Sequence, residues 1–474
     1  MTKSFNAEST SLGARISRRE LLRGAGTAGA IALAGRGTSR AFAQNATPSP
    51  SAPPLPSFSG NAKITSWGFG VEETNPMAFS RVDAFKKQYP NIEIEIVPQF
   101  DSQKLLTGAA SGNVPDVLWL DRFSVASWAA RGVLTSIDDL NANGAIDFSQ
   151  FYDAAVTEAK YNGKLYAVPQ FMDVRALYVN NDALSAAGID PESLDTSNWD
   201  QLSQFGGKLV KKNGDKVDVW GFDHKMEARN IWMWGFGDGG KFISDDGKTL
   251  SYNDPKVVEV LDWGAKAYDA QGGMKLLEAV ATTWQGDEQF ARGQVAMTIY
   301  ESWMLGIVAR VAPDLNFSVV PVKVKGGKDD VSFTGGPAWA IPAKAKNPDA
   351  AWVFIQFMNH PNTWMIGANA VKEARKQANQ PYIPSLTGNK QADQMQIDQV
   401  YESIDPKFDK AVKLFPQLLN YSYNRPISVS PVGQELDDIL DASVKSALRG
   451  EKSAKDAMDD ANNKGQQAIN DFQP

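Results

Sequence analysis

The chain has 474 residues, of which 43% are hydrophobic and 22% are charged, so it can form large hydrophobic cores. No run approaches the ~20 apolar residues of a membrane span, which excludes an integral membrane protein. The formal charge is −7, and beyond residues 1–43 the chain holds 41 Lys and Arg against 53 Asp and Glu. This acidity argues against nucleic-acid binding. There is no cysteine, which excludes disulfides, thiolate metal sites and catalytic thiols.

Residues 1–43 resemble an export signal of the twin-arginine type. Arg18 and Arg19 precede a weakly apolar, Gly-rich segment at 24–35, and Ala41-Phe42-Ala43 provides a small-residue cleavage site. Gln44 stands where a lipoprotein would need cysteine. We therefore expect a protein that folds before export and is periplasmic or secreted, without a lipid anchor.

A Pro- and Ser-rich linker at 44–60 precedes the folded part of the chain. A strand is predicted at 63–69 and an amphipathic helix at 76–89. A second strand follows at 92–96, where Ile and Glu alternate, and a short apolar strand follows at 117–120. Strands alternating with helices predict an α/β sheet with parallel strands.

Polar and aromatic side chains follow two of these strands. Asp121 and Arg122 come directly after the third strand and precede a helix predicted at 123–131. Trp67 and Phe69 stand at the end of the first strand. Ligands of open α/β sheets bind at the carboxyl ends of strands, so these side chains are candidates for contact with a ligand. Asp121 could equally cap the helix that follows it.

The later chain is rich in helices and tryptophan. Trp232 and Trp234 are two positions apart, so they point the same way only on a strand or loop, and core packing is the alternative for each. Further helices are predicted at 182–188, 199–211, 255–270, 348–360 and 454–470.

Three segments together resemble the family 1 extracellular solute-binding proteins, the sugar-binding components of ABC importers. They are residues 111–140, with Pro115-Asp116-Val117 and a Gly-x-Leu after the helix, residues 290–299 (FARGQVAMTI), and residues 333–342 (FTGGPAWAIP). The resemblance implies an α/β fold with two lobes, each a mostly parallel sheet flanked by helices. It also implies a first lobe of residues 61–177 plus 297–343 and a second lobe of residues 178–296 plus 344–474.

The resemblance further implies a non-enzymatic, monomeric carrier that needs no cofactor or metal and delivers a carbohydrate to membrane permease subunits. Carboxylates and Arg would bond sugar hydroxyls, and aromatic rings would stack on the apolar faces of the sugar. The residues implied to contact the ligand are Trp67, Asp121, Arg122, Phe171, Asp173, Trp232, Trp234, Trp284, Glu301, Trp303, Gly336, Trp339 and Arg375. For Asp173, an ion pair with Arg175 or Lys164 is the alternative.

Other functions remain open at this stage. A polyamine would suit Asp121, Asp173 and the aromatic residues equally well, and a secreted glycoside hydrolase could use the same two carboxylates. Iron is disfavoured because no Tyr pair or His cluster occurs, and a phosphate ester because the candidate crevice is acidic and poor in Arg.

Overall fold

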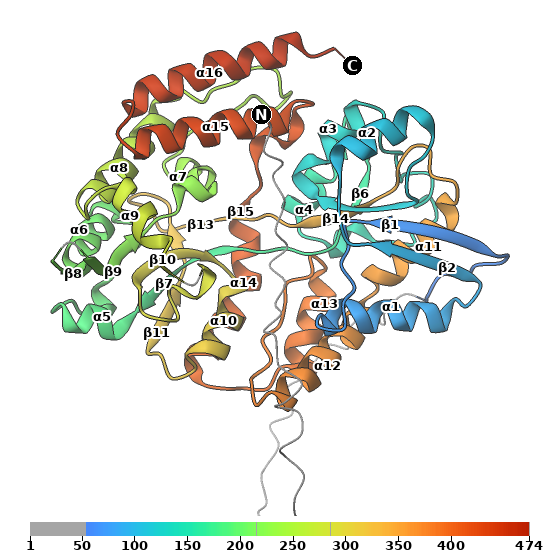
Figure 1. Cartoon of the computed structure of the whole chain (residues 1–474), viewed down its shortest axis with the longest axis horizontal. Helices are drawn as coiled ribbons and strands as arrows, with labels where there is room; N and C mark the ends of the chain where they lie inside the picture. Colours follow the sequence, from blue (N-terminus) through green and yellow to red (C-terminus); the bar gives the residue numbers. More distant parts are fainter. Residues whose placement is uncertain (1–53, 215, 285, 474) are drawn as a thin grey trace, which may run out of the picture.

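A computed structural model describes residues 54–214, 216–284 and 286–473, which form two α/β lobes lying side by side (Figure 1). The proposed export signal at 1–43 and most of the proposed linker at 44–60 lie outside the described residues. Within them, no helix is both long and apolar enough to cross a membrane.

The first lobe is built on a five-stranded sheet in the order β2-β1-β3-β14-β6. β1 (Ala62–Trp67) is parallel to both β2 (Ile92–Val97) and β3 (Val117–Asp121), as the sequence predicted. β14 (Pro337–Ala340) is antiparallel to β3 and to β6 (Ala167–Pro169). The strand that arrives late in the sequence therefore runs against its neighbours.

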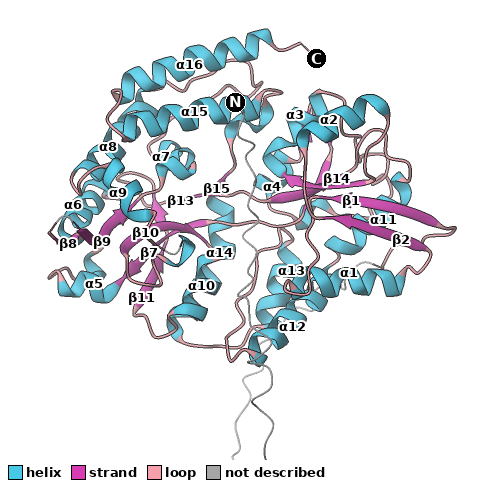
Figure 2. Cartoon of the chain, viewed as in Figure 1, coloured by secondary structure: helices cyan, strands magenta, loops and turns pink. Residues whose placement is uncertain are grey.

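Helices pack on both faces of this sheet (Figure 2). The predicted helix at 76–89 is α1, where Asn75 Oδ1 accepts from Ala78 N at 3.2 Å and Phe85 packs edge-on against Phe354, with ring centroids 5.0 Å apart. The helices of this lobe are α1 (Pro76–Gln88), α2 (Ser102–Ser111), α3 (Val125–Ala130), α4 (Asp153–Glu158), α11 (Pro348–Asn359), α12 (Pro361–Gln377) and α13 (Lys390–Met395).

The second lobe has its own five-stranded sheet, in the order β11-β7-β10-β9-β8. β10 (Val295–Glu301) is parallel to β9 (Lys216–Asp223) but antiparallel to β7 (Arg175–Asn180). β11 (Phe317–Val320) and β8 (Lys211–Asn213) are antiparallel edge strands. The sheets are therefore mixed, and the expectation of mostly parallel sheets was wrong, because strands that arrive from the other lobe enter in the opposite direction.

The second lobe carries most of the remaining helices, and the predicted helices at 182–188, 199–211, 255–270 and 454–470 are found there. They are α5 (Asn181–Ala186), α6 (Trp199–Leu209), α7 (Ile231–Gly237), α8 (Pro255–Asp269), α9 (Met274–Ala281), α10 (Met304–Val311), α14 (Pro406–Leu418), α15 (Gly433–Leu448) and α16 (Ala454–Asp471). A small sheet of β12 (Val322–Lys323), β13 (Asp330–Phe333) and β15 (Ser422–Tyr423) lies where the lobes meet.

The predicted lobe boundaries need correction at both ends. β10 and β11 pair within the second sheet, so most of 297–343 does not belong to the first lobe, which the chain re-enters only at β14. β7 begins at Arg175, so residues 175–177 already belong to the second lobe. Conversely, α11 and α12 pack on the first lobe although 344–474 was assigned to the second. The motifs located the crossings approximately, but strand pairing and core packing determine the boundaries.

Candidate functional site

Two of the crossings between the lobes are extended segments, at 170–174 between β6 and β7 and at 334–336 between β13 and β14. They lie against each other: Asp173 N donates to Gly335 O at 3.3 Å, and Gly335 N donates to Asp173 Oδ1 at 2.9 Å. Gly336 has φ of +134°, and a Cβ there would lie 2.2 Å from Phe171 O. Only glycine allows this approach, so Gly336 brings the crossings together and does not merely leave room for a ligand.

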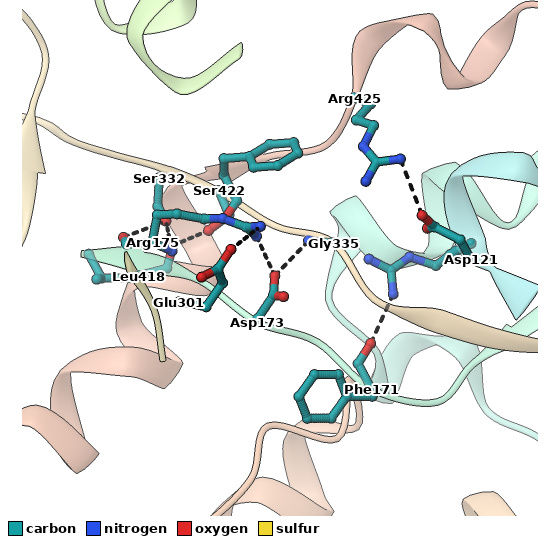
Figure 3. Close-up of polar contacts among 12 residues, drawn as sticks. Asp121, Phe171, Asp173, Arg175, Glu301, Ser332, Gly335, Leu418, Ser422 and Arg425 are labelled. Carbon is teal, nitrogen blue, oxygen red and sulfur yellow. Dashed lines mark hydrogen bonds and ion pairs between the residues drawn. The ribbon is translucent and has the colours of Figure 1, made fainter. Parts of the chain in front are cut away.

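Arg175 is the centre of an ion-pair network at these crossings (Figure 3). Its guanidinium bonds Asp173 and, through Nη2, Glu301 Oε1 at 2.9 Å, while its backbone N and O both bond Ser332 Oγ. The ion pair named as the alternative for Asp173 is therefore present. Asp173 and Glu301 remain only 14% and 21% exposed, so their role in contacting a ligand stays a prediction.

Arg122 does not face the space between the lobes, and the prediction that it donates to a ligand was wrong. Its side chain is fully buried, with Nε 2.9 Å from Glu158 Oε2 and Nη1 donating to Phe171 O at 3.0 Å. Burial raises the pKa of Glu158, an effect that Arg122 and Arg425 oppose. Arg122 thus holds the first crossing in place.

Asp121 lies at the carboxyl end of β3 with its side chain 49% exposed; its capping role is confirmed, and its contact with a ligand stays a prediction. It caps the following turn, accepting from Phe123 N at 3.2 Å, and it also faces Arg425 Nη1 at 3.2 Å. Arg425 lies over the Phe123 ring at 4.3 Å. Burial opposes the charge on Arg425, but Asp121, Asp437 and Glu158 together raise its pKa. Arg425 lies in the segment between β15 and α15, where no sequence pattern distinguishes one residue as a ligand contact.

The first lobe offers a small aromatic pocket of about 170 Å³ beside the first crossing. Trp119 lines it half-buried and donates from Nε1 to Gln170 Oε1 at 3.0 Å, and Phe69 and Phe171 line it as well. Trp67 is instead buried, with Lys104 Nζ 4.7 Å from its ring centroid. Trp119 was missed, although the alternation of side chains in β3 places it opposite Leu118 and Leu120.

The proposed aromatic platform of Trp232 and Trp234 is wrong. Both side chains are fully buried on α7, a helix where a strand or loop was expected. Trp232 packs edge-on against Phe242, and Trp234 donates from Nε1 to His224 O at 3.0 Å. Trp339 is likewise fully buried, in the first-lobe core. These three rings stabilise the lobes and cannot stack on a ligand.

Among the described residues of the second lobe, Trp303 is the exposed tryptophan, at 37%, and it lies two positions after the end of β10. It packs edge-on against Tyr300 with ring centroids 5.2 Å apart. Tyr300 donates to Asp287, and Lys225 Nζ lies 4.4 Å from its ring centroid. An accessible ring thus stands among hydrogen-bonding groups, which is what sugar recognition requires.

A cluster of ionisable groups lies beside Tyr300, at the carboxyl end of β9. Tyr268 Oη lies within hydrogen-bond distance of both Asp223 Oδ1, at 2.8 Å, and Glu227 Oε2, at 2.9 Å, and Lys225 Nζ is 3.6 Å from Asp223. Burial, followed by the charge of Asp223, raises the pKa of Glu227 to about 7. Asp223, Lys225 and Glu227 lie within five positions of the chain, but Tyr268 comes from α8, so only the folded structure brings the four groups together.

Two predicted residues lie apart from these surfaces. Trp284 is half-buried against the second-lobe core. Arg375 lies in the last turn of α12 and donates to Gln380 Oε1 at 2.8 Å, and burial together with nearby Arg310 lowers its pKa. In the described part of the chain, no three His, Cys, Asp or Glu side chains are grouped as a metal site would need.

Residues 80–398, well over half of the chain, match the model of the bacterial extracellular solute-binding proteins. The chain belongs to this family. The resemblance noted in the sequence is confirmed.

Known members of the family extend the comparison. This solute-binding protein is 24% identical over 416 residues to the sn-glycerol-3-phosphate-binding periplasmic protein UgpB of Salmonella typhimurium, covering 83% of this chain and 90% of that protein. It is 26% identical over 264 residues to a maltooligosaccharide ABC transporter solute-binding lipoprotein of Streptococcus pneumoniae, covering 54% and 58% of the two chains.

Solved structures show the same fold. The GacH receptor of Streptomyces glaucescens, solved unliganded and with acarbose, matches with a TM-score of 0.66 at 20% identity, over 87% of this chain and 100% of that one. UgpB of Mycobacterium tuberculosis with glycerophosphocholine matches with a TM-score of 0.67 at 19% identity, over 87% and 99%. The predicted two-lobe α/β fold is confirmed.

Proposed function

We propose that this solute-binding protein captures a carbohydrate or glycoside between its lobes and delivers it to the permease subunits of an ABC importer. The observation that carries the proposal is Trp303, an exposed ring packed against Tyr300, which in turn contacts Asp287 and Lys225. Across the crossings, Trp119 and Asp121 supply a second ring and an accessible carboxylate. Rings that stack on the apolar face of a sugar, with polar groups at its edge, are suited to pyranoses.

The crossings provide the mechanism of capture. A ligand touching both lobes favours the closed arrangement, because only that arrangement allows both sets of contacts. The reciprocal bonds between Asp173 and Gly335 keep the two crossings together while the lobes rotate. The protein acts as a monomer and catalyses no reaction. Its twin-arginine signal directs it, already folded, to the periplasm or the exterior without a lipid anchor.

Calorimetric titration of the purified protein with maltose, trehalose, longer oligosaccharides and spermidine tests the proposal. We expect saturable binding of at least one carbohydrate, lost in Trp303→Ala and weakened in Asp121→Ala. Phe79→Ala is the matched control, because Phe79 is an exposed ring, at 43%, on α1. Binding of spermidine with no response to any carbohydrate would overturn the proposal, as would hydrolysis of a chromogenic glycoside that is lost in Asp173→Asn.

A further inference from the structure

Arg81 is a buried cation in the first lobe with no opposite charge beside it. Its side chain is 1% exposed on α1, donates to Met358 O, and lies 3.7 Å from the ring centroid of Trp364 on α12. Among the described residues, no Asp or Glu oxygen lies within 4.0 Å of its nitrogens. Burying an unpaired charge costs free energy, so this arrangement calls for a compensating group.

Arg81 and Trp364 both line the 170 Å³ pocket that also contains Trp119 and Phe171. Arg81 Nε and Trp364 Nε1, which belong to two of the lining residues, are buried without an acceptor. Nearly all buried donors in proteins have a partner, so two unpaired donors in one pocket are an exception that needs an explanation. No carboxylate lines the pocket, so nothing in its wall would repel an anion.

The dimensions of the pocket limit what enters it. At about 170 Å³ the pocket is small and has room for an acidic group and the adjoining carbon atoms. Gln170 and Phe171, which belong to the first crossing, form part of the wall, so the pocket adjoins the region where the lobes meet.

We propose that this pocket receives the oxyanion of an acidic sugar or sugar phosphate, with Arg81 supplying the charge and Arg81 Nε and Trp364 Nε1 the hydrogen bonds. The proposal rests on the proposed function and narrows its ligand class. Burial lowers the pKa of Arg81 to about 9, so the guanidinium is still charged at neutral pH. The candidate crevice was expected to be poor in Arg because Arg81 lies within α1, where the sequence pattern indicated only an amphipathic helix.

The test compares matched ligands on matched variants of the full chain. Glucuronate, glucose 6-phosphate and glycerol 3-phosphate are titrated against glucose and glycerol, their neutral counterparts, by calorimetry. We expect Arg81→Met to lower affinity for the acidic ligand about tenfold or more, since a charge-assisted bond is lost, and Arg81→Lys to retain part of it. Thermal unfolding of Arg81→Met should match or exceed the wild type, because an unpaired buried charge is removed.

Trp364→Phe removes the second donor while keeping a ring beside Arg81. Trp352→Phe is its control, because Trp352 Nε1 is also buried and unpaired in the same lobe but does not line the pocket. Of these two variants, only Trp364→Phe should lower the affinity for acidic ligands. Equal affinity for acidic and neutral sugars, or unchanged affinity in Arg81→Met, would overturn this inference while leaving carbohydrate capture intact. If no sugar binds, acidic or neutral, both this inference and the proposal of carbohydrate capture are overturned.

Discussion

The buried ion pair between Arg122 and Glu158 gives the sharpest test of how this fold is held together. The side chains are 0% and 1% exposed, 2.9 Å apart, and Arg122 also bonds Phe171 O in the first crossing. Removing one member of such a pair leaves a buried charge uncompensated, which costs about 3–5 kcal/mol. We therefore expect Glu158→Gln to lower the free energy of unfolding by about that amount.

The opposite substitution should depend on pH. In Arg122→Met the pKa of Glu158, already raised by burial, rises further because the lowering effect of Arg122 is gone. Because the pKa of Glu158 is higher in the folded state, protonation of Glu158 stabilises the folded protein. The loss of unfolding free energy in Arg122→Met is therefore smallest below the unfolded-state pKa of ~4.3, and it grows as the pH rises through the folded-state pKa. Arg122→Met should thus lie at least ~1 kcal/mol closer to wild type at pH 5 than at pH 8.

Urea unfolding followed by circular dichroism at both pH values measures these differences. The partly exposed pair of Arg449 and Glu278, with both side chains 35% exposed, is the control, and Glu278→Gln should cost less than about 1 kcal/mol. The double variant Arg122→Met/Glu158→Leu should return to within about 2 kcal/mol of wild type. The reasoning is refuted if Glu158→Gln lowers the free energy of unfolding no more than Glu278→Gln does. It is also refuted if the destabilisation by Arg122→Met is the same at pH 5 and pH 8.

Three further predictions separate the core, the cluster beside β9 and the crossings. Trp232→Ala should cost about 3–5 kcal/mol of unfolding free energy, whereas Trp303→Ala should cost less than about 1 kcal/mol yet abolish ligand binding; the opposite pattern in urea unfolding and titration would contradict both assignments. The pKa of Glu227 is raised to about 7, so its stabilising contribution is complete below ~4.3 and lost as pH rises through 7. At pH 8, Glu227→Gln should therefore unfold at a higher urea concentration than the wild type, with a free energy of unfolding up to about 3 kcal/mol larger. Near pH 4.5 the two proteins should be equally stable. Gly336→Ala should lower the free energy of unfolding by more than about 2 kcal/mol, because the new Cβ meets the backbone of Phe171. Gly326, with φ of +64°, has open space around it, so Gly326→Ala should cost only about 1 kcal/mol. Equal losses in the two variants would show that the close approach at Gly336 is unimportant.

The sequence predicted local structure well where one helix or strand has one clear periodic face. The alternation of Ile and Glu in β2 and the amphipathic helix predicted at 76–89 are examples, and both appear in the structure. Side-chain direction was harder, because tryptophan serves equally in a core and at a surface. Trp232 and Arg122 had the right chemistry for a ligand, but α7 and Glu158 turn them inward, and only tertiary packing reveals this.

The site also contains groups that no local pattern could reveal. Glu227 and Tyr268 are 41 positions apart, and their hydrogen bond depends on how α8 packs beside the end of β9. Arg425 reaches Asp121 across 304 positions. Motif resemblance located the crossings, but it could not show which charges compensate one another.

The threading of the chain through the two lobes has a consequence for how the protein folds during synthesis. The first sheet is incomplete until β14, and its helical cover until α12 ends at Gln377, while the second-lobe core awaits α15 and α16. Each lobe therefore depends on contacts between distant parts of the sequence, which slows folding. Neither lobe can complete its folding before most of the chain has left the ribosome. An export route that accepts only folded proteins would therefore avoid moving the chain across the membrane while its lobes are incomplete.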